Sequence, residues 1–171
     1  MFSVFVPCES SLKKATIEDL SALPENAVWI DLVNPTPAED RAVERLAGVA
    51  IPTREDMQEI EISSRLFIEN STRYMTATLM CQSDTDMPRT TAVTFILGDH
   101  RLVTVRYDLP KPFALVEAKL ARSCAPAITE NSLMMLFCSR LTTPSMASST
   151  KVILFDRYEA WSVSELSLIH I

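Results

Sequence analysis

Short apolar runs rich in β-branched residues alternate with capped helical segments along this chain, and this alternation limits the fold more than any other feature. Residues 1–6 and 27–33 have the composition of strands, and the second run is apolar almost throughout, as expected of a strand buried on both faces. Two hairpins are predicted to follow, over residues 65–80 and 90–107. The pattern predicts an α/β fold with a mixed β-sheet and helices on its outside.

The first helix has signals at both ends. Thr36 can cap its N-terminus, Pro37 takes the first helical position, and Glu39 completes a capping box. An apolar stripe follows, and Gly48 is placed to end the helix. These signals predict a helix from Pro37 to just before Gly48.

An acidic stretch over residues 51–70 repeats this pattern. Thr53 can cap a second helix, and Asp56 stands three residues on, where its carboxylate can return a hydrogen bond. Met57 and Ile60 are expected to face inward, whereas the remaining acids face water, namely Glu55, Glu59 and Glu61. The residues alone therefore favour a helix cap and a solvated helix face over a metal site.

Prolines begin a third predicted helix, over residues 109–123. We assign most of its apolar surface to Ala114, Leu115, Ala118, Leu120 and Ala121. In the loop between the two predicted hairpins, Asp84 and Asp86 have the spacing of oxygen ligands. Because neither a glycine turn nor a terminal glutamate accompanies them, a solvated loop is the preferred interpretation.

Composition excludes several classes of function. A net charge of −6 argues against a nucleic-acid partner. The 2 glycines cannot form a phosphate-binding loop or a dinucleotide fingerprint, and the 2 histidines leave no H-E-x-x-H zinc site. A histidine-dependent triad would have to use His100, which is expected to be exposed in a turn. We therefore expect no catalytic residues, no required cofactor and no enzyme activity.

The cysteines indicate the redox environment of the chain, and the apolar runs indicate whether it could span a membrane. The 4 cysteines form no C-x-x-C pair, which is typical of a reduced, cytoplasmic setting. No apolar run approaches the roughly 18–20 residues of a spanning helix. The chain as given is expected to be soluble.

Five ordered motifs resemble the cytoplasmic N-terminal domain of the CorA family of divalent-cation transporters. They are WIDLVNPTPAEDRAVE, IPTREDMQEIEISSRLFIEN, YMTATLM, VTFILGDHRLVTVRY and PKPF, and the resemblance runs from about Val28 to Phe137. It implies an α/β/α sandwich and, for the full-length protein, a homopentameric magnesium or cobalt channel in the cell membrane with this domain in the cytoplasm.

The chain also departs from that family. The Gly-Met-Asn signature of the pore and both membrane helices are missing from the sequence. After Phe137 the sequence becomes rich in serine and threonine, and its end, LSLIHI, resembles a sequencing adapter. We therefore expect a domain over residues 1–137 and an irregular tail over residues 138–171 from another reading frame or an adapter, with a genuine alternative C-terminus as the other explanation.

The resemblance gives Asp56 a second role. Its position matches an acidic residue that helps to bind a regulatory divalent ion between subunits in such proteins, so Mg²⁺ is the implied regulatory ion and Asp56 a weak ligand. The implied function is a cytoplasmic fragment of a divalent-cation transport protein, unable to conduct ions alone. The alternative is a stand-alone soluble α/β binding module or small enzyme.

Overall fold

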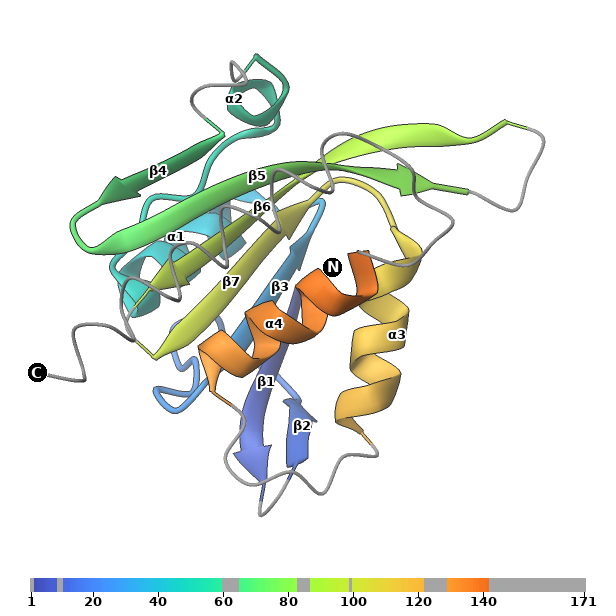
Figure 1. The fold of residues 1–171 in the computed structure, drawn as a ribbon. Helices are drawn as coiled ribbons and strands as arrows, with labels where there is room; N and C mark the ends of the chain where they lie inside the picture. The colour runs from blue at the N-terminus through green and yellow to red at the C-terminus, as the bar shows by residue number, and fades with distance from the viewer. Residues whose placement is uncertain are drawn as a thin grey trace, which may run out of the picture.

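A seven-stranded mixed sheet forms the centre of the computed structural model, which describes residues 2–8, 11–59, 65–82, 87–98, 100–121 and 129–141. The strand order is β2-β1-β3-β7-β6-β5-β4 (Figure 1). Only β3 and β7 pair in parallel within this sheet; its other neighbours are antiparallel. The elements are β1 (Phe2–Cys8), β2 (Ser11–Ala15), β3 (Trp29–Val33), α1 (Pro37–Ala47), α2 (Arg54–Glu59), β4 (Leu66–Glu69), β5 (Thr72–Cys81), β6 (Arg89–Gly98), β7 (Arg101–Arg106), α3 (Lys111–Leu120) and α4 (Glu130–Leu141).

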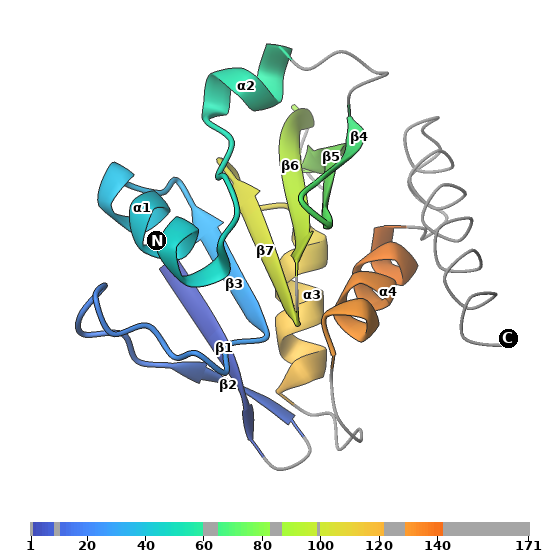
Figure 2. The same ribbon diagram turned by 90° about the vertical axis from the view of Figure 1, so that its left-hand side faces the viewer.

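Helices cover both faces of this sheet. In Figure 2, α1 and α2 lie on one side and α3 and α4 on the other. The α3/α4 side holds an aromatic cluster in which Phe137 contacts the rings of Trp29, Phe95 and Phe113. The α1/α2 side is mainly aliphatic, with Ile30, Leu32, Val43, Met57, Ile96, Val103 and Val105. The predicted mixed sheet with helices on both sides is therefore confirmed.

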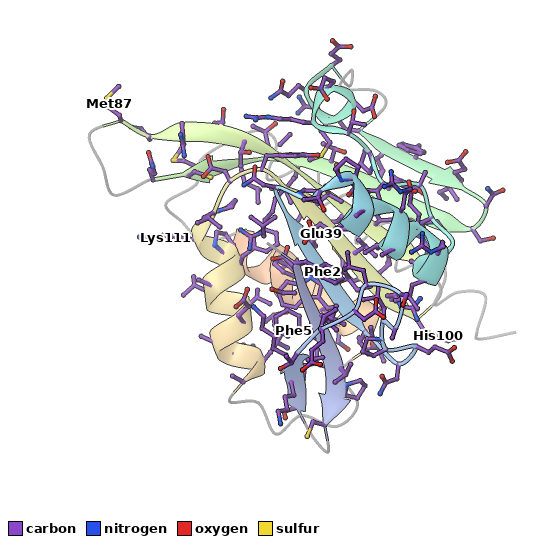
Figure 3. The ribbon with its side chains drawn as sticks, turned by 180° about the vertical axis from the view of Figure 1, so that it is seen from behind. Phe2, Phe5, Glu39, Met87, His100 and Lys111 are labelled. Atoms are coloured by element: carbon purple, nitrogen blue, oxygen red, sulfur yellow. The ribbon has the colours of Figure 1, made fainter. Side chains whose placement is uncertain are left out.

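Both predicted hairpins are present. Strands β4 and β5 turn at Asn70 and Ser71, whose φ angles are 48° and 66°. Strands β6 and β7 pair antiparallel up to Gly98 and Arg101, and His100 is exposed just before β7 (Figure 3). At the far end of β6, Met87 lies at the distal tip of the β5–β6 pair and is 81% exposed (Figure 3).

Helix α1 has the predicted ends. The Thr36 hydroxyl accepts a hydrogen bond from the Glu39 amide, and the Glu39 carboxylate accepts one from the Thr36 amide at 2.7 Å. Gly48 follows the helix with a φ of 66°, a left-handed conformation that glycine adopts without a steric penalty. The Arg101 guanidinium donates to the Leu46 carbonyl oxygen at 2.9 Å, which ties the end of α1 to the start of β7.

The predicted apolar face of α3 is wrong, except for Leu120. The helix buries Pro112, Phe113, Val116 and Leu120, while Leu115 is 51% exposed. Phe113, Val116 and Leu120 form an i, i+3, i+7 stripe. Because these side chains bury more apolar area than the alanines do, the helix turns this stripe toward the sheet.

Two elements carry no clear local signal in the sequence. Strand β2 has the sequence SLKKA, and helix α4 buries Leu133, Met134 and Phe137. Helix α4 crosses the predicted domain boundary, since residues 138–141 continue it. The rest of the predicted tail, residues 142–171, lies outside the described residues. Within the described ranges, no helix has the length and apolarity needed to cross a membrane.

Candidate functional site

The predicted capping box at the start of α2 is present. The Thr53 hydroxyl donates to Oδ2 of Asp56 at 2.7 Å, and the Thr53 amide donates to the same oxygen at 2.9 Å. In return, the Asp56 amide donates to the Thr53 hydroxyl at 3.2 Å. Helix α2 is six residues long, so these bonds fix a large part of its backbone.

The same bonds set the charge of Asp56. The hydrogen bond from the Thr53 side chain, followed by the one from its backbone, lowers the pKa of this carboxyl below its ordinary value of 3.8. The side chain is exposed and therefore keeps its water. Asp56 is a carboxylate at neutral pH, and it presents its charge to solvent at the edge of the domain.

Asp56 also lines a groove, which we call the α2–β4 groove. Its volume is about 270 Å³, and its lining residues come from the segment before α2, from α2 and from strands β4, β5 and β6, namely Ala50, Ile51, Pro52, Asp56, Met57, Phe67, Glu69, Tyr74, Thr76 and Thr94. Figures 1 and 2 show α2 near β4, the edge strand of the sheet, and residues of both elements line the groove. It contains two carboxylates on an otherwise largely apolar wall.

Tyr74 holds the two sides of this groove together. Its hydroxyl oxygen accepts a hydrogen bond from the Ala50 amide at 3.1 Å, and its ring stacks on Phe67 with 4.6 Å between centroids. Burial raises the pKa of Tyr74, and the charges of Glu69 and Glu44 raise it further. The tyrosine is therefore neutral, and it fixes the segment before α2 against the sheet.

Two threonine hydroxyls in the groove lining are hydrogen-bonded to each other. The hydroxyls of Thr76 and Thr94 form a hydrogen bond of 2.8 Å between β5 and β6. Because each hydroxyl already has a hydrogen-bond partner, neither needs a ligand to complete its hydrogen bonding.

The donor set fits a divalent cation only in part. Mg²⁺ takes six oxygen ligands and often keeps several waters, so one or two carboxylates can hold it weakly. Among the described residues that line the groove, Asp56 and Glu69 carry the carboxylates. No group of three or more histidine, cysteine or acidic residues suited to a metal occurs in the described part of the chain. The described residues thus offer outer contacts for a hydrated ion.

Of the other candidates from the sequence, only His100 can be placed relative to this groove. His100 lies in the β6–β7 turn and is not among the groove's lining residues. Asp84, Asp86, Ile60 and Glu61 lie outside the described residues. Sequence reasoning missed Phe67, Glu69 and Tyr74 as groove residues, because only the position of α2 over the strands brings them together.

Beneath the sheet surface, two of the motifs meet in a buried polar network. Asp31 in β3 accepts from the Arg106 guanidinium in β7 at 2.7 Å, and the side chains are 1% and 4% exposed. The Thr104 hydroxyl donates to Asp31 at 2.7 Å and accepts from the Trp29 indole at 3.0 Å. The Arg106 guanidinium also lies 4.2 Å from the centre of the Phe113 ring.

This network has a structural role: it joins β3 to β7 in the core. Every hydrogen bond runs between the parallel strands or to their immediate neighbours, and both charges are compensated. The network connects the WIDL and LVTVR motifs. Its residues occupy alternate positions of the two parallel strands, so their polar side chains lie on the same face and reach each other.

Comparison with known proteins gives relatives that share part of this sequence. No family model matches the chain. A magnesium transport protein CorA of Campylobacter jejuni is 31% identical over 113 residues, which is 61% of this chain and 35% of that protein. The chain therefore spans about a third of the length of such a relative.

Solved structures share the fold at low sequence identity. The soluble domain of CorA from Methanocaldococcus jannaschii has a TM-score of 0.58 at 13% identity and covers 99% of this chain and 65% of that one. The cytoplasmic domain of ZntB from Vibrio parahaemolyticus has a TM-score of 0.57 at 12% identity and covers 81% of this chain and 56% of that one. Sequence and fold together confirm the resemblance stated above: the chain is similar in sequence to part of CorA magnesium transport proteins and similar in fold to a soluble domain of CorA.

Proposed function

We propose that this chain is the cytoplasmic domain of a magnesium or related divalent-cation transport protein that acts as a homopentamer in the cell membrane. The relatives that carry the word CorA are named magnesium transport proteins, and none of the names reported above is that of an enzyme. The observation that supports the proposal most is the ordered set of motifs from Trp29 to Phe113, which builds one continuous sheet of the same fold.

The genomic sequence tests this proposal directly. Reading the DNA beyond codon 138 in all three frames should give a long charged helix followed by two apolar segments of about 18–20 residues each. It would also show whether residues 138–171 belong to another reading frame. A locus with no such segments in any frame would contradict the proposal.

We further propose that this chain alone conducts no ions. Irregular backbone cannot cross a bilayer unaided, and the described helices are too short or too polar to span one. Reconstitution in liposomes with a magnesium-sensitive dye should give the signal of empty vesicles. A magnesium-dependent signal above that level would contradict this part.

For Asp56 we propose a minor role in divalent-ion binding beside its role as a helix cap. The cap is supported by three hydrogen bonds to Thr53, whereas a metal would find two carboxylates in the groove. If magnesium binds measurably, the stability of the wild-type chain should rise with magnesium concentration by mass action, and Asp56→Asn should reduce that rise. Glu55→Gln, which removes an exposed charge outside the groove lining, is the matched control.

A further inference from the structure

The α2–β4 groove has a lining that divalent-cation binding would not use. A hydrated metal ion needs only the carboxylates of Asp56 and Glu69, yet most of the wall is apolar or aromatic, with Ile51, Pro52, Met57, Phe67 and Tyr74. The part of the lining that the structure describes includes no lysine, arginine or histidine. Its chemistry is that of a negatively charged groove with an apolar wall.

The two carboxylates come from different elements. Asp56 belongs to α2 and Glu69 is the last residue of β4, and Figure 2 shows these as separate elements of the fold. At Asp56 both hydrogen bonds from Thr53 go to Oδ2, so Oδ1 is the oxygen that remains for a ligand. Glu69 is exposed and lines the groove, and its charge contributes, after burial, to the raised pKa of Tyr74.

The aromatic pair suits a cation with a hydrocarbon chain. Phe67 is 40% exposed even though its ring stacks on Tyr74. The face of an aromatic ring attracts ammonium groups, and methylene groups pack favourably on the same surface. A stem of several methylenes would cover apolar area that water now contacts.

We propose that the α2–β4 groove binds a linear aliphatic diammonium ion, with one ammonium group at Asp56, the other at Glu69, and the methylene chain along the exposed surface of Phe67. A bare metal ion would leave the aromatic wall uncovered, and a neutral alkyl molecule would leave both carboxylates without a counter-charge. The inference does not depend on the transport role, because it uses only the groove of this domain.

A chain-length series tests the proposal. The full chain is titrated calorimetrically at pH 7 and low ionic strength with diaminoalkanes of three to six carbons, with pentylamine and with 1-pentanol. We expect one site, an optimum chain length, and diamine binding about threefold or more tighter than pentylamine, since the second ammonium gains one partly exposed ion pair. Equal affinity for pentylamine or for 1-pentanol would overturn the proposal.

Two variants locate the site. Glu69→Gln should reduce the affinity for the best diamine to about that for pentylamine, whereas Glu55→Gln, with the same charge change on α2 but outside the lining, should alter it less than about twofold. Equal weakening by both variants would mean a diffuse charge effect and would overturn the proposal. Displacement of the diamine by equimolar Mg²⁺ would assign the groove to divalent cations instead and would also overturn it.

Discussion

The hydrogen bonds between Thr53 and Asp56 make the stability of the domain depend on the ionisation of Asp56, so the contribution of this helix cap can be measured as a function of pH. Because the folded-state pKa of Asp56 lies below its ordinary value of 3.8, the ionised form contributes stability above that value, and this contribution is lost as the pH falls through the folded-state pKa. Asp56→Asn should therefore lower the urea midpoint at pH 7 by roughly 0.3 M, and the gap to the wild type should close below pH 3.8.

Urea unfolding followed by circular dichroism between pH 3 and pH 7 measures this gap. Glu55→Gln again serves as the control, since Glu55 has an exposed side chain on the same helix. A gap that stays constant down to pH 3 would show that the charge of Asp56 does not support the cap.

A second residue-scale prediction concerns the buried pair of Asp31 and Arg106. Asp31→Ala leaves the guanidinium of Arg106 buried without its counter-ion, which should cost about 3–5 kcal/mol of unfolding free energy. The matched control is Arg89→Ala. It breaks the pair of Arg89 and Asp108, whose side chains are 58% and 20% exposed, and should cost less than about 1 kcal/mol. Similar losses in both variants would contradict the structural role of the buried network.

At the scale of secondary-structure elements, the end of α1 depends on one backbone conformation. Gly48 has a φ of 66°, and an added Cβ would meet no atom within 4 Å. Any cost of Gly48→Ala therefore comes from the left-handed backbone and should be about 1 kcal/mol, while Gly48→Asn should cost less because asparagine adopts this conformation more readily. Chemical unfolding of the two variants compares these costs directly; a larger loss for asparagine would contradict the explanation.

Helix α4 supplies the second prediction at this scale. Its Phe137 fills the space between Trp29, Phe95 and Phe113 and is fully buried. Phe137→Ala should cost about 3–5 kcal/mol because it leaves a cavity in the aromatic cluster. The exposed Met135 of the same helix provides the control, and Met135→Ala should change the unfolding free energy by less than about 0.5 kcal/mol. Equal losses at the two positions would mean that α4 does not cover the sheet.

At the scale of the whole molecule, the sequence predicts what local patterns control. The capping boxes of α1 and α2, the two hairpins and the buried strand β3 follow from residues that are close in the chain. Strand β2 was missed because SLKKA has only one strongly apolar side chain. The face of α3 was misassigned because several apolar stripes compete on one helix, and only the sheet decides which is buried.

The candidate site was predicted only in part for a related reason. Thr53 and Asp56 are three residues apart, so their bond could be predicted from spacing. Phe67, Glu69 and Tyr74 enter the groove from a hairpin whose position relative to α2 depends on the order of the strands. That order is set by non-local pairing, for which a single sequence carries little signal.

The one parallel pairing also governs how such a chain reaches its native state. Strands β1 to β3 and strands β4 to β7 form two groups whose neighbours are close in sequence, whereas β3 and β7 join residues 73–75 positions apart. Closing this long loop costs entropy before any contact repays it, so the two groups should form early and associate late. Trp29 lies on the joining strand, and its indole environment thus reports the final step of folding.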